Sequence, residues 1–256
     1  MVVSESRAVV WHDLECGSYT ADLLLWRELA GAAPDARDAA STVLDVGAGT
    51  GRVTLDLAGA GHEVTALDLD PELLAALRER AVGMRVETVC ADARTFALPR
   101  SDFSLCIAPM QTVQLLGGSA QRVEFLRRAH AHLRPGGVLA CAIVTEIDAF
   151  DCDAGDLGPT PEIVRIEGVS YISRATRVQV GRRAVRIERE RAVLASEEQA
   201  TQKQQPTWVR DVVDLDQVSV AQLQREGREA GLVAAGTRVI PATEEHTASV
   251  AVMFGA

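Results

Sequence analysis

Hydrophobic and polar positions along residues 42–145 follow two alternating patterns. Short apolar runs, typical of buried strands, occupy residues 43–46, 63–69, 84–90, 103–108 and 138–145. Segments with helical spacing of apolar residues lie between some of them, at 52–58, 71–80 and 119–133. Alternating strands and helices are typical of a parallel sheet with helical crossover connections. We therefore predict an α/β core, preceded by an amphipathic helix over 19–29, with Ser119 as the N-cap of the last helix and 134–137 as its stop.

The pattern changes after residue 148. A stretch rich in Gly, Pro and Asp leads into two β-rich runs, 168–180 and 184–196, which predict an antiparallel hairpin with 207–215 as a third strand. A helix over 219–230, ending at Gly231, and strands over 232–240 and 248–254 then complete the core. We expect three parts: 1–148 as an N-terminal helical cap and core, 149–216 as an antiparallel insert, and 217–256 as the C-terminal part of the core sheet.

The loop after the first predicted strand carries glycine at every second position, as Gly47, Gly49 and Gly51. Glycine lets the backbone approach a ligand closely, and the helix that follows offers unpaired N–H groups and positive potential. Asp68 ends the second predicted strand 17 residues after Gly51, where a carboxylate can accept hydrogen bonds from ribose hydroxyls. The pattern indicates a ligand that contains adenosine.

The spacing of the loop bears on which adenosine ligand it binds. A dinucleotide site favours Gly-x-Gly-x-x-Gly, whereas Gly51 comes one residue early and Arg52 takes the later place. Asp45, two residues before Gly47, would offset a cationic ligand but would lie awkwardly beside a pyrophosphate. The loop by itself still leaves other nucleotide ligands open.

At these residues the sequence resembles the class I S-adenosylmethionine-dependent methyltransferases, and among them the small-molecule enzymes. Their motif acid-x-Gly-x-Gly-x-Gly is matched by Asp45, Gly47, Gly49 and Gly51, and their ribose-binding acid by Asp68. The likeness covers residues 41–146 and includes Ala91-Asp92-Ala93, Ile107-Ala108-Pro109-Met110 and Leu133-Arg134-Pro135-Gly136-Gly137. It implies a Rossmann-like fold with a seven-stranded, mostly parallel sheet, and an inserted antiparallel sheet that caps the active site.

The resemblance also implies S-adenosyl-L-methionine as cofactor and S-adenosyl-L-homocysteine as product. It assigns Asp92 to the adenine amino group, Ala108 and Pro109 to the neighbourhood of the reactive methyl, and Tyr19 to the cofactor's carboxylate. The full set of implied cofactor-binding residues is Tyr19, Asp45, Gly47, Ala48, Gly49, Gly51, Asp68, Leu69, Asp92, Ala93, Ala108 and Pro109.

Methyl transfer mainly requires alignment of the acceptor atom with the methyl group and exclusion of water. The end of the fourth predicted strand, Ala108-Pro109-Met110-Gln111, lacks the Asn/Asp-Pro-Pro-aromatic sequence of enzymes that methylate bases or amides, and the acids of catechol-type metal enzymes. We therefore predict a small-molecule amine or hydroxyl acceptor and no metal. Candidate general bases are His12 and Glu146, each with a solvated residue as the alternative, and candidate substrate contacts are Trp11, Gln114 and Arg174.

Net charge and composition limit the classes of binding partner that we expect. A net charge of -10 and 4% aromatic residues disfavour nucleic-acid binding. Residues 165–191 nevertheless carry eight arginines against three glutamates, which indicates either a solvated strand face or a lid that attracts an acidic group. A homodimer is a further expectation.

Location and alternative functions complete the expectations. No apolar run approaches the roughly 18 residues of a membrane span, the N-terminus lacks a signal-like pattern, and none of the five cysteines forms Cys-x-x-Cys. These features predict a cytoplasmic protein without a membrane segment. The alternatives are a methyltransferase for RNA or protein, a cofactor-binding regulator without catalysis, and an NAD-dependent oxidoreductase.

Overall fold

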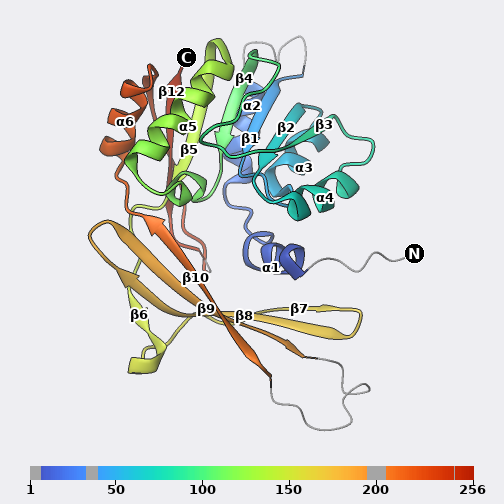
Figure 1. Ribbon diagram of the computed structural model, residues 1–256, viewed down its shortest axis with the longest axis vertical. Coiled ribbons are helices and arrows are strands. Elements are labelled where there is room, and N and C mark those ends of the chain that lie inside the picture. Colours follow the sequence, from blue (N-terminus) through green and yellow to red (C-terminus); the bar gives the residue numbers. More distant parts are fainter. Residues whose placement is uncertain (1–6, 33–39, 195–205, 245) are drawn as a thin grey trace. The chain divides into compact units, whose positions relative to one another are not determined.

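The computed structural model describes residues 7–32, 40–194, 206–244 and 246–256 (Figure 1). The chain separates into two compact units, one of residues 1–18 and 147–217 and the other of residues 19–146 and 218–256. The end of the second predicted hairpin strand, 195–196, lies outside the described residues. Within those residues, no helix is long and apolar enough to cross a membrane.

The larger unit is built on a seven-stranded sheet of order β11-β12-β5-β4-β1-β2-β3 (Figure 1). Strands β1 to β5 pair in parallel, whereas β12 runs antiparallel to both β5 and β11. The elements are α2 (Leu23–Ala32), β1 (Thr42–Val46), α3 (Arg52–Gly59), β2 (Glu63–Asp68), α4 (Pro71–Arg80), β3 (Val86–Cys90), β4 (Phe103–Ala108), η1 (Thr112–Leu115), α5 (Ser119–His132), β5 (Leu133–Ile143), α6 (Val220–Glu229), β11 (Val233–Ile240) and β12 (Ser249–Gly255). The predicted fold class is confirmed.

Helices cover both faces of this sheet, and their apolar sides pack in three clusters, the smallest of which contains Leu74 and Leu77 of α4. On one face, Trp26 of α2 and Leu57 of α3 pack with alternate residues of β1 and β4, such as Val43 and Leu105. On the other face, α5 and α6 pack against the remaining residues of the same strands. Every residue of β4 is buried, which explains its continuous apolar run. The alternation also places Asp45 of β1 on the α3 side of the sheet, because it lies two residues after Val43.

The smaller unit is a five-stranded antiparallel sheet with one helix, α1 (Arg7–Cys16). Its strands are β6 (Phe150–Asp151), β7 (Glu162–Ile166), β8 (Val169–Val180), β9 (Ala184–Leu194) and β10 (Trp208–Asp216), and the short helix η2 (Cys152–Ala154) follows β6. The order is β10-β9-β8-β6, and β7 also pairs with β8. The hairpin and its third strand therefore form as the sequence predicts.

Helix α1 packs on the small sheet through one buried carboxylate and one aromatic contact. Glu15 accepts hydrogen bonds from Arg191 Nε and Nη2, both at 2.7 Å, and from Ser173 Oγ at 2.7 Å. Burial pushes the pKa of Glu15 up, but these bonds outweigh it and leave the pKa below its usual value. Trp11 meets the ring of Tyr171 edge-on, with centroids 5.4 Å apart.

Several local expectations were wrong at the N-terminal side. The helix expected over 19–29 runs from Leu23 to Ala32, and the separate helix α1 was not expected. Residues 7–18, which were expected in one part with the core as its N-terminal helical cap, belong to the smaller unit. Alternation of polar and apolar residues is weak in α1, so only its tertiary contacts reveal where it packs.

The expected N-cap of α5 was also wrong, whereas its expected stop is confirmed. Ser119 is the first residue of the helix rather than its N-cap, because its hydroxyl donates to Glu226 Oε1 of α6 at 2.6 Å. The helix ends at His132, directly before the predicted stop at 134–137, and those residues lie inside β5. Ala256 pairs with this segment, since its N–H donates to Gly137 O at 3.0 Å and its carbonyl accepts from Gly136 N at 3.2 Å.

Candidate functional site

The glycine loop between β1 and α3 requires glycine at two positions, each of which has a positive φ and a close neighbouring side chain. Gly47 has a φ of 74°, and a Cβ atom there would lie 2.6 Å from the side chain of Thr112. Gly51 has a φ of 96°, and a Cβ atom there would lie 2.2 Å from Leu77 Cδ1. Both backbone conformations are strained for any residue with a side chain. The loop can therefore turn tightly at the N-terminus of α3, where N–H groups remain available to a ligand.

Asp68, at the end of β2, is tied to this loop. Its Oδ2 accepts a hydrogen bond from Gly49 N at 2.8 Å, and its Oδ1 accepts from Asp70 N at 2.9 Å. The next residue, Leu69, is 65% exposed. Asp70, not Asp68, caps α4 through bonds from the backbone of Glu72 and Leu73. Asp68 is thus free of a capping role, and its carboxylate orientation is fixed by the loop that it faces.

Asp45 is a buried carboxylate directly before the loop. Its Oδ2 accepts a hydrogen bond from Thr54 Oγ1 of α3 at 2.6 Å, whereas Oδ1 has no hydrogen-bond partner among the described residues. Burial raises its pKa to about 6, and the Thr54 bond and the charge of Arg52 offset this only in part. A buried carboxylate oxygen without a partner is costly, so a cationic or hydrogen-bond-donating ligand beside it would relieve that cost.

An ion pair supports the loop from α2. Arg52 donates to both carboxylate oxygens of Asp22, at 2.5 and 2.8 Å, and to Tyr19 O at 2.8 Å. Asp22 is fully buried and also accepts from Trp26 Nε1 at 2.8 Å. Sequence reasoning missed Asp22 and Trp26, because an Asp–Arg contact across 30 residues leaves no local pattern.

Tyr19 lies beside this ion pair. The guanidinium carbon of Arg52 lies over the Tyr19 ring, 5.2 Å from its centroid. The centroid of the His246 ring lies 4.7 Å from that of Tyr19. Burial raises the pKa of its hydroxyl. The side chain is therefore packed and neutral at ordinary pH.

The predicted adenine contact at Asp92 follows β3. Its carboxylate accepts from Arg94 N at 2.8 Å and from the Arg94 guanidinium, with Nη2 at 2.5 Å. The Arg94 side chain accordingly holds the pKa of Asp92 below its usual value. Ala93 packs against the apolar core of the α5 side. Asp92 remains ionised and keeps accepting capacity beyond its bonds to Arg94.

The end of β4 forms a strained turn near the loop. Ala108 and Pro109 are buried, and Met110 has a φ of 54°, which is unusual for a residue other than glycine. Thr112 closes the turn by donating from Oγ1 to Pro109 O at 2.9 Å, and the same side chain occupies the space that a Cβ at Gly47 would need. Backbone strain of this kind clusters at functional sites. Thr112 therefore joins the end of β4 to the glycine loop.

A family described as "Methyltransferase domain" matches residues 43–137, which run from β1 to the first part of β5 and include all the loop residues above. Residues 43–137 are therefore similar to a methyltransferase domain. The matched segment agrees with the core of the resemblance recognised in the sequence.

Relatives and solved structures extend the comparison. The chain is 35% identical over 123 residues to a probable cobalt-precorrin-6B C(15)-methyltransferase of Methanothermobacter thermautotrophicus, which aligns with 45% of this chain and 59% of that protein. The chain therefore spans about three fifths of the length of this relative. Its fold resembles the sugar N-methyltransferase KedS8 of Streptoalloteichus, with a TM-score of 0.71, 18% identity and coverage of 98% of this chain and 94% of that one. It also resembles CalS10, an amino pentose methyltransferase of Micromonospora echinaspora, with a TM-score of 0.67, 23% identity and coverage of 98% and 99%.

The residues of the methyltransferase domain fit S-adenosylmethionine. The unpartnered Oδ1 of Asp45 suits a cationic ligand, the left-handed glycines admit close approach, and the fixed carboxylate of Asp68 suits a ribose. The structure brings Asp45, Gly47, Gly49 and Asp68 together at the carboxyl ends of β1 and β2. Direct contacts of each with the cofactor remain predictions.

Two predicted acceptor-side residues belong to the larger unit. Gln114 of η1 is 2% exposed, and its amide pairs with the backbone of Val144, donating to the carbonyl at 3.1 Å and accepting from N–H at 2.7 Å. This pairing fixes Gln114 at the end of β5. Glu146 is exposed, and its carbonyl accepts from Thr247 Oγ1 at 3.3 Å. Its carboxylate is therefore accessible from solvent.

The other predicted acceptor-side residues belong to the smaller unit. His12 and Trp11 lie half-buried on α1, and the Arg191 guanidinium lies 5.6 Å from the Trp11 ring. Arg174 of β8 pairs with Glu190 and stacks on Trp208, with its guanidinium carbon 4.4 Å from the ring centroid. Their roles toward an acceptor remain predictions.

Proposed function

We propose that this protein transfers a methyl group from S-adenosylmethionine to a nitrogen or oxygen atom of a small molecule, with an amine nitrogen as the preferred acceptor. The observation that carries the proposal is the extent of the structural likeness. It includes the small antiparallel sheet as well as the methyltransferase domain, since 94% and 99% of the lengths of KedS8 and CalS10 are covered. Both proteins carry names that state methylation of a sugar or an amino sugar.

The cofactor side of the proposal assigns one role to each group of residues. S-adenosylmethionine supplies a methyl group on a sulfonium: the acceptor's lone pair forms the new bond while the sulfur keeps the electrons of the broken one. The Gly47–Gly51 backbone and the N-terminus of α3 would hold the amino acid portion. Asp68 would accept bonds from the ribose hydroxyls, and Asp45 would offset positive charge. Ala48, Leu69, Ala93, Ala108 and Pro109 would supply the apolar and backbone surface around the adenosine and the methyl group.

The acceptor side requires alignment and proton removal. An amine must reach the methyl group in its neutral form, and the proton that it carries must then leave. Glu146 and His12 are the proposed bases, because one is an accessible carboxylate and the other an imidazole, and both kinds of side chain serve as proton acceptors in enzymes. Gln114, Trp11 and Arg174 are proposed substrate contacts.

A location in the cytoplasm and a homodimer are further proposals, the second testable by light scattering.

The deciding experiment is a turnover assay. The protein is incubated with S-adenosylmethionine and a panel of small amines, amino sugars and alcohols, and S-adenosylhomocysteine is measured. We expect product with at least one amine and a gain of one methylene in its mass. A matched panel with RNA and peptide acceptors gives no product under this proposal.

Two results would contradict the proposal. Product formed only with a macromolecule would assign an RNA or protein acceptor. Binding of S-adenosylmethionine without turnover on any acceptor would assign a regulator. The variant Asp68→Ala serves as the control for background hydrolysis, because it should lose activity through weaker cofactor binding.

A further inference from the structure

The smaller unit contains a cavity of about 550 Å³ that shares only Arg174 with the candidate site residues described above. Its volume lies within the range of ligand pockets in proteins. It is lined by the β6–β7 connection and by three neighbouring strands, through Cys152, Asp153, Gly158, Pro159, Pro161, Arg174, Ala175, Thr176, Arg177, Glu188, Glu190 and Arg210. All of these residues belong to one compact unit.

The cavity lies on the face of the small sheet that α1 does not cover. Helix α1 contacts Arg191 of β9 through Glu15. Successive side chains of a strand point to opposite faces, so Glu188 and Glu190 face away from Arg191. Both glutamates line the cavity.

Charges alternate across this face. Arg174 of β8, Glu190 of β9 and Arg210 of β10 lie directly opposite one another in the strand register, and Arg177 lies opposite Glu188 in the next row. Neighbouring strands are about 4.8 Å apart, so donors and acceptors repeat at short intervals. The lining carries three arginines and three acids and is therefore neutral overall.

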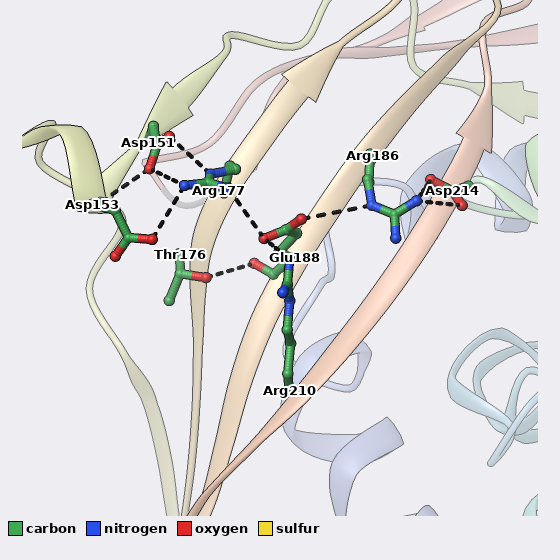
Figure 2. A network of polar contacts seen from close by, with 8 residues as sticks. All are labelled: Asp151, Asp153, Thr176, Arg177, Arg186, Glu188, Arg210 and Asp214. Atoms are coloured by element: carbon green, nitrogen blue, oxygen red, sulfur yellow. Dashed lines mark hydrogen bonds and ion pairs between the residues drawn. The ribbon is translucent and has the colours of Figure 1, made fainter.

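A buried glutamate holds this arrangement rigid (Figure 2). Glu188, which is 7% exposed, lies at the centre of the network and forms ion pairs with Arg210 at 2.5 Å, Arg186 at 3.6 Å and Arg177 at 3.9 Å. Asp151 and Asp153 hold Arg177 from the other side, at 2.9 and 3.2 Å. The polar atoms of the cavity are thus fixed before any ligand arrives, which lowers the cost of binding.

Some of these atoms keep unused hydrogen-bonding capacity. Arg174 donates from both Nε and Nη2 to the same oxygen, Glu190 Oε2, at 3.1 and 2.7 Å. Among the described residues, Glu190 Oε1 and Arg174 Nη1 have no hydrogen-bond partner, and the 59% exposed side chain of Arg210 pairs only with Glu188. Arg174 also stacks on Trp208, which orients its guanidinium.

This combination selects a class of ligand. An anion would be repelled by Glu188, Glu190 and Asp153, and a cation by the three arginines. A hydroxyl group both donates and accepts, whereas a guanidinium only donates and a carboxylate only accepts. Neighbouring hydroxyls on a ring can therefore bond an arginine and a glutamate together. Pro159, Pro161 and Ala175 add an apolar border for the ring carbons.

We propose that this cavity binds the hydroxyl-bearing ring of a neutral saccharide. The binding does not depend on the cofactor, because every residue of the lining lies outside residues 43–137, which match the methyltransferase domain.

The test is a titration of the full chain with methyl glucopyranoside, methyl galactopyranoside and methyl mannopyranoside, observed by saturation-transfer NMR. We expect saturable binding of at least one sugar with a dissociation constant of about 1 to 10 mM, as a few hydrogen bonds would give. The variants Arg210→Gln and Glu190→Gln should weaken it about fivefold to tenfold, since each loses one donor or acceptor. The matched control is Arg165→Gln, an exposed arginine of β7 outside the lining.

Three results would overturn the proposal. The first is no saturable binding of any of the three sugars to a folded wild-type chain. The second is equal affinity of wild type and Arg210→Gln, whose exposed side chain makes a folding defect a poor explanation. The third is binding of inorganic pyrophosphate, but not of sugars, with the same dependence on Arg210. In the variant Asp68→Ala, sugar binding should be unchanged, which separates this proposal from the proposed methyl transfer.

Discussion

One ion pair between two helices of the larger unit is buried, whereas one ion pair between two strands of the smaller unit is open to solvent. In the larger unit, Arg122 and Glu226 join α5 to α6 with side chains 2% and 5% exposed. In the smaller unit, Arg186 and Asp214 join β9 to β10 with side chains 46% and 57% exposed. The same chemical pair should therefore have different energetic consequences, because water screens the second and not the first.

The largest effect is expected at the buried pair. Arg122→Met should lower the free energy of unfolding by about 3 to 5 kcal/mol, because it leaves the Glu226 carboxylate buried without its partner. Equilibrium unfolding in urea measures this loss, provided that the dependence of the unfolding free energy on urea concentration is the same in both proteins. A loss below about 1 kcal/mol would mean that the pair is screened like a surface pair.

A double variant and pH sharpen this test. Arg122→Met combined with Glu226→Leu should recover much of the loss, since no unpaired charge remains.

Burial raises the pKa of Glu226, but bonds from Arg122, Ser119 and Gln222 outweigh it and leave the pKa below its usual value. A lowered carboxyl pKa contributes stability above the unfolded value, and this contribution disappears as pH falls through the folded one. The wild type should therefore lose its advantage over the single variant in acid.

The second effect is expected at Asp68. Replacement by Ala should weaken S-adenosylhomocysteine binding by about 1 to 3 kcal/mol, because it removes the acceptor of the ribose bonds and also the bond to Gly49 N. Isothermal calorimetry measures the affinity. Asp70→Asn is the matched control, since Asn can still cap α4 and the change is one residue beyond Leu69. Equal loss in both variants would show a general effect of the turn rather than a ribose contact.

The third effect is a pH dependence from Asp45. A bound cation favours the ionised carboxylate, whereas the free site keeps its proton up to a pKa of about 6. Affinity for S-adenosylmethionine should therefore rise with pH by up to about tenfold per unit below about 6, and level off above it. Calorimetry across pH 5 to 8 checks this, and Asp45→Asn should abolish the slope. A flat profile in the wild type would place the positive charge of the ligand away from Asp45.

The smallest effect is expected on the small sheet. Arg186→Gln should change the free energy of unfolding by no more than about 1 kcal/mol, because its pair with Asp214 is exposed and Glu188 keeps Arg177 and Arg210 as partners. The same urea experiment applies. A loss of stability as large as that of Arg122→Met would show that the exposed and the buried ion pair contribute equally. The network around Glu188 would then behave as a buried cluster.

The sequence predicts the larger sheet well because its signals are local. The buried strands are mostly apolar, and the glycines of the loop have left-handed backbone conformations that favour glycine. Both signals can be detected in short stretches of the sequence. The hairpin of the smaller sheet is predictable for a similar reason, since a turn at 181–183 lies between two β-rich runs.

Contacts between distant residues could not be predicted in this way. Asp22 supports the loop through Arg52, Thr112 packs into the space left by Gly47, and Ala256 pairs with Gly136 and Gly137 of β5. None of these pairs produces a periodic pattern. The helix α1 belongs to the smaller unit through Glu15 and Trp11, whose partners lie more than 150 residues away in the chain.

The most direct test of the cofactor assignment is calorimetry of the wild-type chain with S-adenosylhomocysteine and, separately, with NAD. The geometry of Asp45, Gly47, Gly49 and Asp68 predicts saturable binding of S-adenosylhomocysteine, weakened by Asp68→Ala, and no heat from NAD. Saturable binding of NAD, or no binding of S-adenosylhomocysteine by a folded chain, would contradict it.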